Sequence, residues 1–384
     1  MPFSGNTFTN VAGATTAVAG QTVQSAVWDN IHTDYATALT ALMSQLTSQI
    51  TNRNAIWMNG GFEVWQRGAG SSASIAVAAT TTAYTADRWY VTTGANQASV
   101  ISAQTGLVTP SSSCARIRRN AAQTGTTVYI FGYPLDSDEI LRLRGSKVSF
   151  TCLVQAGANW SPASGTLSVA LYSGTGAVAK RGGGFTNEVT VLSISTNLTA
   201  GGAVTTITGS STIVLPATAT QAELQFTWTP VGTAGAADDI SIDDVQLEAQ
   251  LSATTWTPTN YDRLDFPTML QGCQRHYNKT FPYSVVASAG AGQVGQLEYM
   301  AAQITNQSAV LYVYPVRMRV TPGITTYNPG TGTANWQNNN TSADIAATID
   351  PGGSKSDASA FIVAATVTNV GNFIGIQVTG SAGI

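Results

Sequence analysis

The chain has 384 residues, a net charge of −3 and only 10% charged residues, and its length allows two or three domains. No cluster of Lys or Arg is present, so the sequence gives no electrostatic footprint for nucleic acid or for an anionic membrane surface. It also lacks an apolar run of about 18 residues and an N-terminal secretory signal, so we expect neither membrane insertion nor export by that route. Gly occurs 37 times, which favours a β-rich protein with many tight turns.

Residues 1–55 are predicted to form an N-terminal segment that contains one long amphipathic helix. The first 22 residues are small and polar, and they lack the apolar side chains that a core requires. From residue 24 to residue 52, apolar residues recur at spacings of three and four, as on one face of a helix. This stripe contains Trp28, Ile31, Tyr35, Leu39, Leu42, Leu46 and Ile50. Because no second helix of similar length is expected, the pattern favours association between copies of the chain; the alternative is a helix packed against its own β-domain.

Residues 56–255 are predicted to form a jelly-roll β-sandwich. Apolar residues alternate at period 2 in three stretches, which are separated by turns rich in Gly, Ser and Asn. These stretches cover residues 148–154, 167–171 and 224–228. Helical periodicity is absent from the region, so the strands favour a sandwich. Trp89 and Trp228 are in phase with apolar neighbours, and we expect both in the core.

The closing strand of this sandwich requires a β-bulge. Its apolar residues change parity between Ile242 and Val245, so they share one face only if an extra residue is inserted at Asp243 or Asp244. Two prolines follow, at positions 258 and 267, and each interrupts regular strand pairing. The sequence therefore predicts a domain boundary near residue 255.

Residues 256–384 are predicted to form a second, C-terminal β-sandwich. Its strand candidates are a short apolar run and two alternating stretches. They cover residues 309–314, 361–367 and 374–378. Between the first two lies a polar stretch at residues 331–344, which is rich in turn formers and is predicted to be an exposed loop. The whole chain is thus expected to be mainly β.

Three parts of the sequence resemble bacteriophage tail-fibre and related virion proteins. They are IDDVQLE followed by YDRLDFPTMLQGCQRHYNKTF, then NGGFEVWQRG with TADRWYV, and finally PVRMRVTPGITTYNP. In the proteins that they resemble, a carbohydrate-binding-module-like jelly roll ends in the first of these segments. The resemblance implies a virion structural component, namely a homotrimeric tail fibre or tail-tip protein used in host attachment. Such a protein joins other tail or baseplate proteins through its N-terminus and contacts a host surface glycan. A head or collar fibre, or a decoration protein, is the alternative within a virion.

The resemblance also implies one metal site. In jelly-roll modules of this type, a structural calcium ion is often held where the opening strand meets the closing strand. Glu63 and Asp243 stand at the matching positions, and carboxylate oxygens suit Ca²⁺ chemically. The alternative is that these carboxylates bind backbone amides at the bulge. We expect no other cofactor.

Candidates for glycan contact are aromatic and amide side chains in predicted turns. Trp160 and Trp336 stand among turn residues and offer flat faces for a sugar ring, while neighbouring amides offer donors and acceptors to its hydroxyl groups. The candidates are Trp160, Tyr327, Trp336, Asn338, Asn339 and Asn340. Because the N-terminus is expected at the particle, the C-terminal domain is expected to be distal and to contact the receptor.

The sequence offers little for catalysis. Neither of its two histidines has a partner at metal-ligand spacing, and no nucleophile elbow or P-loop is present. A polysaccharide depolymerase, the one enzymatic alternative, needs two carboxyl groups about 5 to 10 Å apart. Asp136, Asp138 and Glu139 are clustered, but Arg142 and Arg144 follow and are expected to form surface ion pairs with them. We therefore predict a non-enzymatic protein.

Overall fold

The chain divides into two compact units, residues 1–51 and 52–384. The computed structural model describes residues 33–39, 54–250, 258–301, 305–349, 353, 355–366 and 370–383. In the first unit, residues 33–39 are helical, and Tyr35 and Leu39 are 63% and 61% exposed there. The other members of the predicted apolar stripe lie outside the described residues, so self-association of this helix stays a prediction. They are Trp28, Ile31, Leu42, Leu46 and Ile50.

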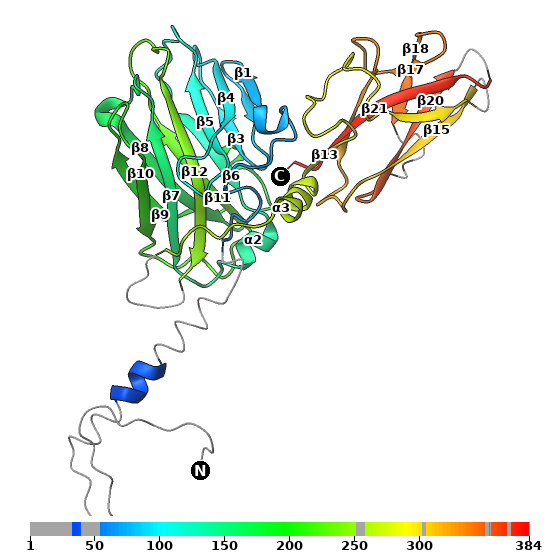
Figure 1. The fold of residues 1–384 in the computed structure, drawn as a ribbon. Helices are drawn as coiled ribbons and strands as arrows, with labels where there is room; N and C mark the ends of the chain where they lie inside the picture. The colour runs from blue at the N-terminus through cyan, green and yellow to red at the C-terminus, as the bar shows by residue number, and fades with distance from the viewer. Residues whose placement is uncertain are drawn as a thin grey trace, which may run out of the picture. The chain divides into compact units, whose positions relative to one another are not determined.

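The second unit begins with a sandwich of two six-stranded antiparallel sheets (Figure 1). The first sheet has the strand order β1-β4-β5-β12-β7-β10, and its strands are Ser74–Val77, Ser99–Gln104, Cys114–Arg119, Asp239–Ala249, Val148–Ala156 and Thr205–Ser210. The second has the order β2-β3-β6-β11-β8-β9, and its strands are Thr82–Tyr84, Tyr90–Thr92, Tyr129–Pro134, Gln221–Trp228, Thr166–Gly174 and Val189–Asn197. Successive strands cross repeatedly between the sheets, as in a jelly roll. The predicted fold class is confirmed.

Large aromatic side chains fill the space between these sheets. Trp89 is fully buried, and its ring stacks on Phe131 with centroids 4.9 Å apart. Trp228 is also buried and stacks on Tyr129 at 5.2 Å. Both tryptophans were predicted to be core residues, and both predictions are confirmed. Aromatic side chains bury large areas, so this cluster contributes strongly to the stability of the sandwich.

Strand β12 contains the predicted bulge. Its register with β7 shifts between Asp243 and Gln246, and Asp244 has a left-handed backbone angle, φ +48°. The extra residue brings Ile242 and Val245 into the core together, as the change of parity predicted. Asp243 in the bulge accepts hydrogen bonds from the loop between β4 and β5, and Asp244 accepts from Arg263 in the connector that follows β12.

Two short α-helices flank the sandwich. They are α2, Ser137–Leu141, and α3, Phe266–Gln274, and three 3-10 turns cover Gly70–Ser72, Ala163–Gly165 and Arg181–Gly183. Asp136 caps α2, while Asp138 pairs with Arg275 at 3.3 Å. The expected surface ion pair is wrong for Glu139, which is fully buried and bonds to Arg88 at 2.9 Å. Within the described residues, no helix has the length and apolar character required to cross a membrane.

The remaining strands form the second sandwich that the sequence predicts. In one sheet β21 pairs with β13, β14, β16 and β17, and β17 also pairs with β18; the other sheet has the order β15-β20-β19. From β13 to β21 these strands are Tyr277–Lys279, Leu297–Met300, Thr305–Val313, Gly323–Tyr327, Trp336–Asn338, Asp344–Ile345, Ala347–Ile349, Ser359–Thr366 and Phe373–Ser381. The predicted boundary at residue 255 lies outside the described residues and stays a prediction.

Candidate functional site

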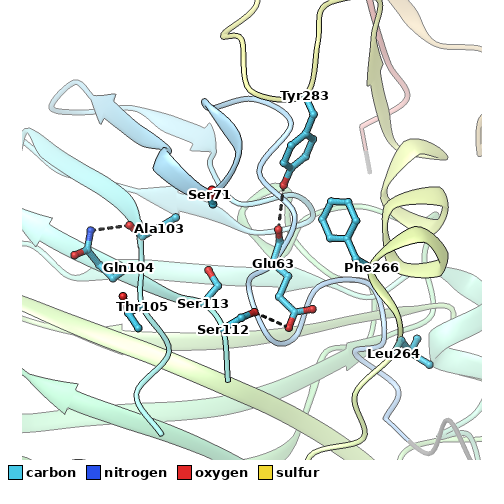
Figure 2. A pocket seen from close by; sticks show the side chains of 10 residues that line it. All are labelled: Glu63, Ser71, Ala103, Gln104, Thr105, Ser112, Ser113, Leu264, Phe266 and Tyr283. Atoms are coloured by element: carbon cyan, nitrogen blue, oxygen red, sulfur yellow. Dashed lines mark hydrogen bonds between the residues drawn. The ribbon is translucent and has the colours of Figure 1, made fainter. Parts of the chain in front are cut away.

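An open cavity of about 750 Å³ lies where the opening segment of the first sandwich meets the connector before α3 (Figure 2). Five chain segments contribute to its walls: the opening segment, the end of β4, the turn before β5, the start of α3 and the loop after β13. The lining residues are Glu63, Ser71, Ala103, Gln104, Thr105, Ser112, Ser113, Leu264, Phe266 and Tyr283.

One wall of the cavity is aromatic. Phe266 is 40% exposed at the start of α3, and its ring meets the edge of the Tyr283 ring with centroids 5.5 Å apart. The Tyr283 hydroxyl donates to the carbonyl oxygen of Glu63 at 3.0 Å and accepts from the amide of Trp65 at 2.9 Å. The Tyr283 hydroxyl is thus fixed both as a donor and as an acceptor, and the Tyr283 ring packs against Phe266. The cavity therefore contains an oriented and accessible aromatic face.

Glu63 contributes a polar, acidic group to the cavity. Its Oε1 accepts from the Ser112 hydroxyl at 3.2 Å and lies 3.4 Å from the Arg263 guanidinium. Its second carboxylate oxygen accepts no hydrogen bond from the part of the chain that the structure describes. Burial raises the pKa of the Glu63 carboxyl above its usual value, while the Ser112 hydrogen bond and the charge of Arg263 oppose that rise. This half-buried carboxyl group is available to a ligand.

The Gln104 side chain extends the polar wall. Its amide nitrogen donates to the Ser102 hydroxyl at 3.1 Å and to the Ala103 carbonyl at 2.6 Å. The hydroxyl groups of Ser71 and Thr105 are exposed beside it. The open cavity thus combines an accessible aromatic ring with a carboxyl group, an amide oxygen and several hydroxyl groups. This combination matches the apolar face and the hydroxyl groups of a sugar ring.

Of the two predicted metal residues, Glu63 lines this cavity and Asp243 is not among its lining residues. Asp243 is fully buried: its Oδ2 accepts from the amide of Leu107 at 2.8 Å, and its Oδ1 accepts from the amide of Asp244 at 2.8 Å. Asp243 thus binds backbone amides at the bulge, which was the alternative to a metal site. Asp244 binds Arg263, and burial and the charge of Asp243 raise its pKa to about 7, against the opposing charge of Arg263. No group of three or more His, Cys, Asp or Glu suited to a metal ion occurs among the described residues.

The predicted exposure of Trp160 is wrong. Its side chain is only 7% exposed, its indole nitrogen donates to the Gly165 carbonyl at 3.0 Å, and its ring packs beside Trp228 with centroids 5.7 Å apart. The surrounding turn folds back over the end of the sandwich, so the indole closes the core there. The turn residues around Trp160 correctly indicated a turn but not the direction of its side chain.

The predicted exposure of Trp336 is also wrong. This residue begins β17, which pairs with β18 and β21 inside the region predicted to be a loop, and its side chain is fully buried. Asn338 is buried as well, and its carboxamide oxygen accepts from the amides of Asn340 at 3.0 Å and Thr341 at 3.2 Å. These contacts form a turn after β17.

The remaining glycan candidates have internal partners and do not converge on the cavity. Tyr327 is half-buried and meets the edge of the Phe281 ring at 5.4 Å. Asn339 donates to Glu298 at 2.8 Å. Asn340 is exposed, and its side-chain oxygen accepts from the amide of Phe373 at 2.8 Å.

Sequence reasoning identified Glu63 but missed the residues around it in the cavity. Phe266 had a local signal, because Asp265 caps α3 and Pro267 follows at its start, which leaves Phe266 on the exposed first turn. Gln104 and Ser112 had no such signal, because only the pairing of β4 with β5 brings them near Glu63.

Comparisons with known proteins add fold likenesses only. No family model and no curated protein match the chain. Among solved structures, it is similar to the enzymatically active domain of tailspike protein 4 from bacteriophage CBA120, with 13% identity over 52% of this chain and 22% of that chain and a TM-score of 0.30. It is similar to a family 11 carbohydrate-binding module from Clostridium thermocellum, with 12% identity over 47% of this chain and 98% of that chain and a TM-score of 0.28. A cyclase from Fischerella sp. gives 13% identity over 51% of this chain and 95% of that chain and a TM-score of 0.32. Likenesses at these TM-scores carry no argument about function.

Proposed function

We propose that this chain recognises a glycan and that the cavity between Glu63 and Phe266 is the binding site. The observation that carries the proposal is the combination in one open cavity of an accessible aromatic ring with a carboxyl oxygen that has no partner in the described chain. A sugar ring stacks its C–H face on an aromatic side chain while its hydroxyl groups donate to nearby oxygens. Both kinds of contact are available here on side chains that internal hydrogen bonds already orient.

The lining favours a neutral sugar over an acidic one. Among the described residues, no Lys or Arg lines the cavity, and Arg263 beside it is already bonded to Glu63 and Asp244. A uronic or sialic acid would bring a second negative charge to Glu63, and like charges in a half-buried site repel. The proposed ligand is therefore a neutral host-surface glycan.

The place of the protein in a virion is part of the same proposal. The three sequence segments that resemble virion proteins support a tail fibre or tail-tip protein that joins other tail or baseplate proteins through its N-terminus. The exposed apolar residues Tyr35 and Leu39 on the N-terminal helix support a homotrimer, in which three cavities would add avidity. A head or collar fibre or a decoration protein is the alternative, and electron microscopy of particles labelled at the C-terminus distinguishes these positions.

Glycan-array screening followed by calorimetry tests the binding site. We expect Phe266→Ala to weaken binding about tenfold, the equivalent of about 1.4 kcal/mol, because the stacking face is lost. Glu63→Gln should weaken it similarly, because hydrogen bonds to a charged group are the stronger ones. Phe373→Ala is the matched control, since Phe373 is 47% exposed and lies outside the cavity. Unchanged affinity in both cavity variants would place the glycan elsewhere.

We propose that the site binds without cleaving. Glu63 is the one carboxylic acid among the described residues that line the cavity, whereas glycoside hydrolysis uses two. Incubating the protein with the bound polysaccharide should release no new reducing ends. Release that disappears in Glu63→Gln would instead support the depolymerase alternative.

A further inference from the structure

At the edge of the cavity, two acidic side chains contact one guanidinium group, and a third lies beside them. Glu63 comes from the opening segment, Asp243 and Asp244 come from the bulge in β12, and Arg263 comes from the connector. Arg263 Nη2 donates to both carboxylate oxygens of Asp244, at 2.6 and 2.7 Å, and Nη1 lies 3.4 Å from Glu63 Oε1. The guanidinium carbon also lies 5.0 Å from the centre of the Tyr261 ring. Three separate segments are therefore joined through one cation.

These residues do not fit a calcium ion while Arg263 is in place. Calcium takes about six to eight oxygen ligands at about 2.3–2.6 Å. Both oxygens of Asp244 are bonded to Arg263, and the two oxygens of Asp243 accept from two backbone amides and from the Ser111 hydroxyl. A metal ion at Glu63 and Asp243 would have to compete with Arg263 for Glu63, and with two backbone amides and the Ser111 hydroxyl for Asp243.

We infer that Arg263 is the resident cation of this acidic site and takes the place of a calcium ion between Glu63 in the opening segment and the bulge in β12. A guanidinium group suits the role because its planar fork binds one carboxylate with two parallel hydrogen bonds and contacts another from a third direction. The first sandwich is then closed by the connector that follows it, and its stability does not depend on a divalent metal.

The acidic side chains of this cluster outnumber its one cation. When ionised, Glu63 and Asp244 contact one guanidinium and Asp243 lies beside Asp244, so the site keeps an excess of negative charge even with Arg263 present. If the guanidinium is removed, Glu63 and both oxygens of Asp244 lose their cation while the opening segment and β12 still hold them close together. Without the guanidinium, the site should bind a calcium ion.

Thermal unfolding of the full chain in EDTA and in calcium chloride tests this, independently of glycan binding. Wild type should melt at the same temperature in both buffers. Arg263→Met should melt about 5 °C lower in EDTA, because its carboxylates lose their partner, and calcium should restore the melting temperature in a concentration-dependent way. Adding Asp244→Asn to that variant should abolish the calcium response. Arg317→Met is the control, because Arg317 forms an exposed ion pair with Asp357 at 3.1 Å.

Two results would overturn the inference. Wild type that melts at a lower temperature in EDTA would show that a metal supports the native site. Arg263→Met that is folded but insensitive to calcium would show that the carboxylates form no cation site. If Arg263→Met does not fold in EDTA, refolding it in calcium gives the same test: recovery only with calcium supports the inference, and no recovery in either buffer overturns it.

Discussion

The two β-sandwiches place their large apolar side chains differently. In the first, the residues of β11 that alternate with its core aromatics are polar and are themselves buried, at Gln221, Glu223 and Gln225. In the second, β15 and β20 expose apolar side chains on their outer face: Leu311, Val313 and Phe361 are 45%, 62% and 42% exposed. Leu311 and Phe361 are directly paired across the two strands. The second sandwich therefore exposes paired apolar side chains on one sheet face, and such a face favours a partner.

The largest effect is expected from breaking the core of the first sandwich. Trp89→Ala removes a fully buried ring that stacks on Phe131, and it should lower the free energy of unfolding by about 3–5 kcal/mol. Chemical denaturation measures this loss. Trp336→Ala is the corresponding change in the second sandwich, and it should destabilise the strands around β17. A mild effect of Trp89→Ala, under about 1 kcal/mol, would contradict the view that this sandwich depends on its aromatic core.

The junction between the sandwiches gives the next largest effect, through pH. Arg88 Nη1 lies 3.1 Å from His276 Nδ1, and His276 Nε2 faces Asp136 at 3.4 Å. The amide of Ala382 donates to the carbonyl of His276 at 2.8 Å, so the second sandwich is joined at the same place. Burial, together with the charge of Arg88, lowers the pKa of His276 to about 4.

A histidine whose pKa is depressed in the folded state stabilises the protein only while it is neutral. Its contribution is fully present above the unfolded value of 6.5, and it is lost as the pH falls from 6.5 toward 4, by up to about 3 kcal/mol. His276→Gln keeps a hydrogen-bonding group but cannot titrate. Denaturation at pH 7 and pH 4.5 should therefore show a smaller loss in this variant than in wild type. Equal losses in the two proteins would assign the acid sensitivity to other groups.

The sequence predicted those features that depend on local periodicity. The change of parity between Ile242 and Val245 was enough to predict the bulge, and the phase of Trp228 was enough to place it in the core. Trp160 and Trp336 were misjudged, because Gly, Ser and Asn around a tryptophan indicate a turn without showing which way its ring points. Turn composition therefore predicts the path of the backbone better than the exposure of a side chain.

The candidate site was predictable only in part, because its residues come from distant segments. Glu63 was identified through the resemblance, but its contact with Arg263 joins residues 200 positions apart in the chain. Charged residues at such distances have no periodic relation, so no local pattern pairs them. The bond between Arg88 and Glu139 was missed for the same reason.

The smallest effect on folding, but a large one on assembly, is expected from the exposed face of the second sandwich. The strands β15, β20 and β19 contain no charged residue, so the same face on another copy meets no repulsion. In the proposed homotrimer we expect neighbouring copies to cover this face. Leu311→Lys should change the stability of the single chain by no more than about 0.5 kcal/mol, because Leu311 is already exposed. It should nevertheless weaken the trimer, because association would bury an unpaired charge.

Sedimentation of the full chain separates these two effects. Wild type should sediment as a trimer at micromolar concentration, and Leu311→Lys should shift the distribution toward single chains. Val128→Lys is the matched control, because Val128 is 48% exposed in the first sandwich, where no assembly contact is expected. A Leu311→Lys variant that remains fully trimeric would leave the N-terminal helix as the assembly contact. Wild type that sediments as a single chain would contradict the homotrimer, and the apolar face of β15 and β20 would then require a partner other than this chain.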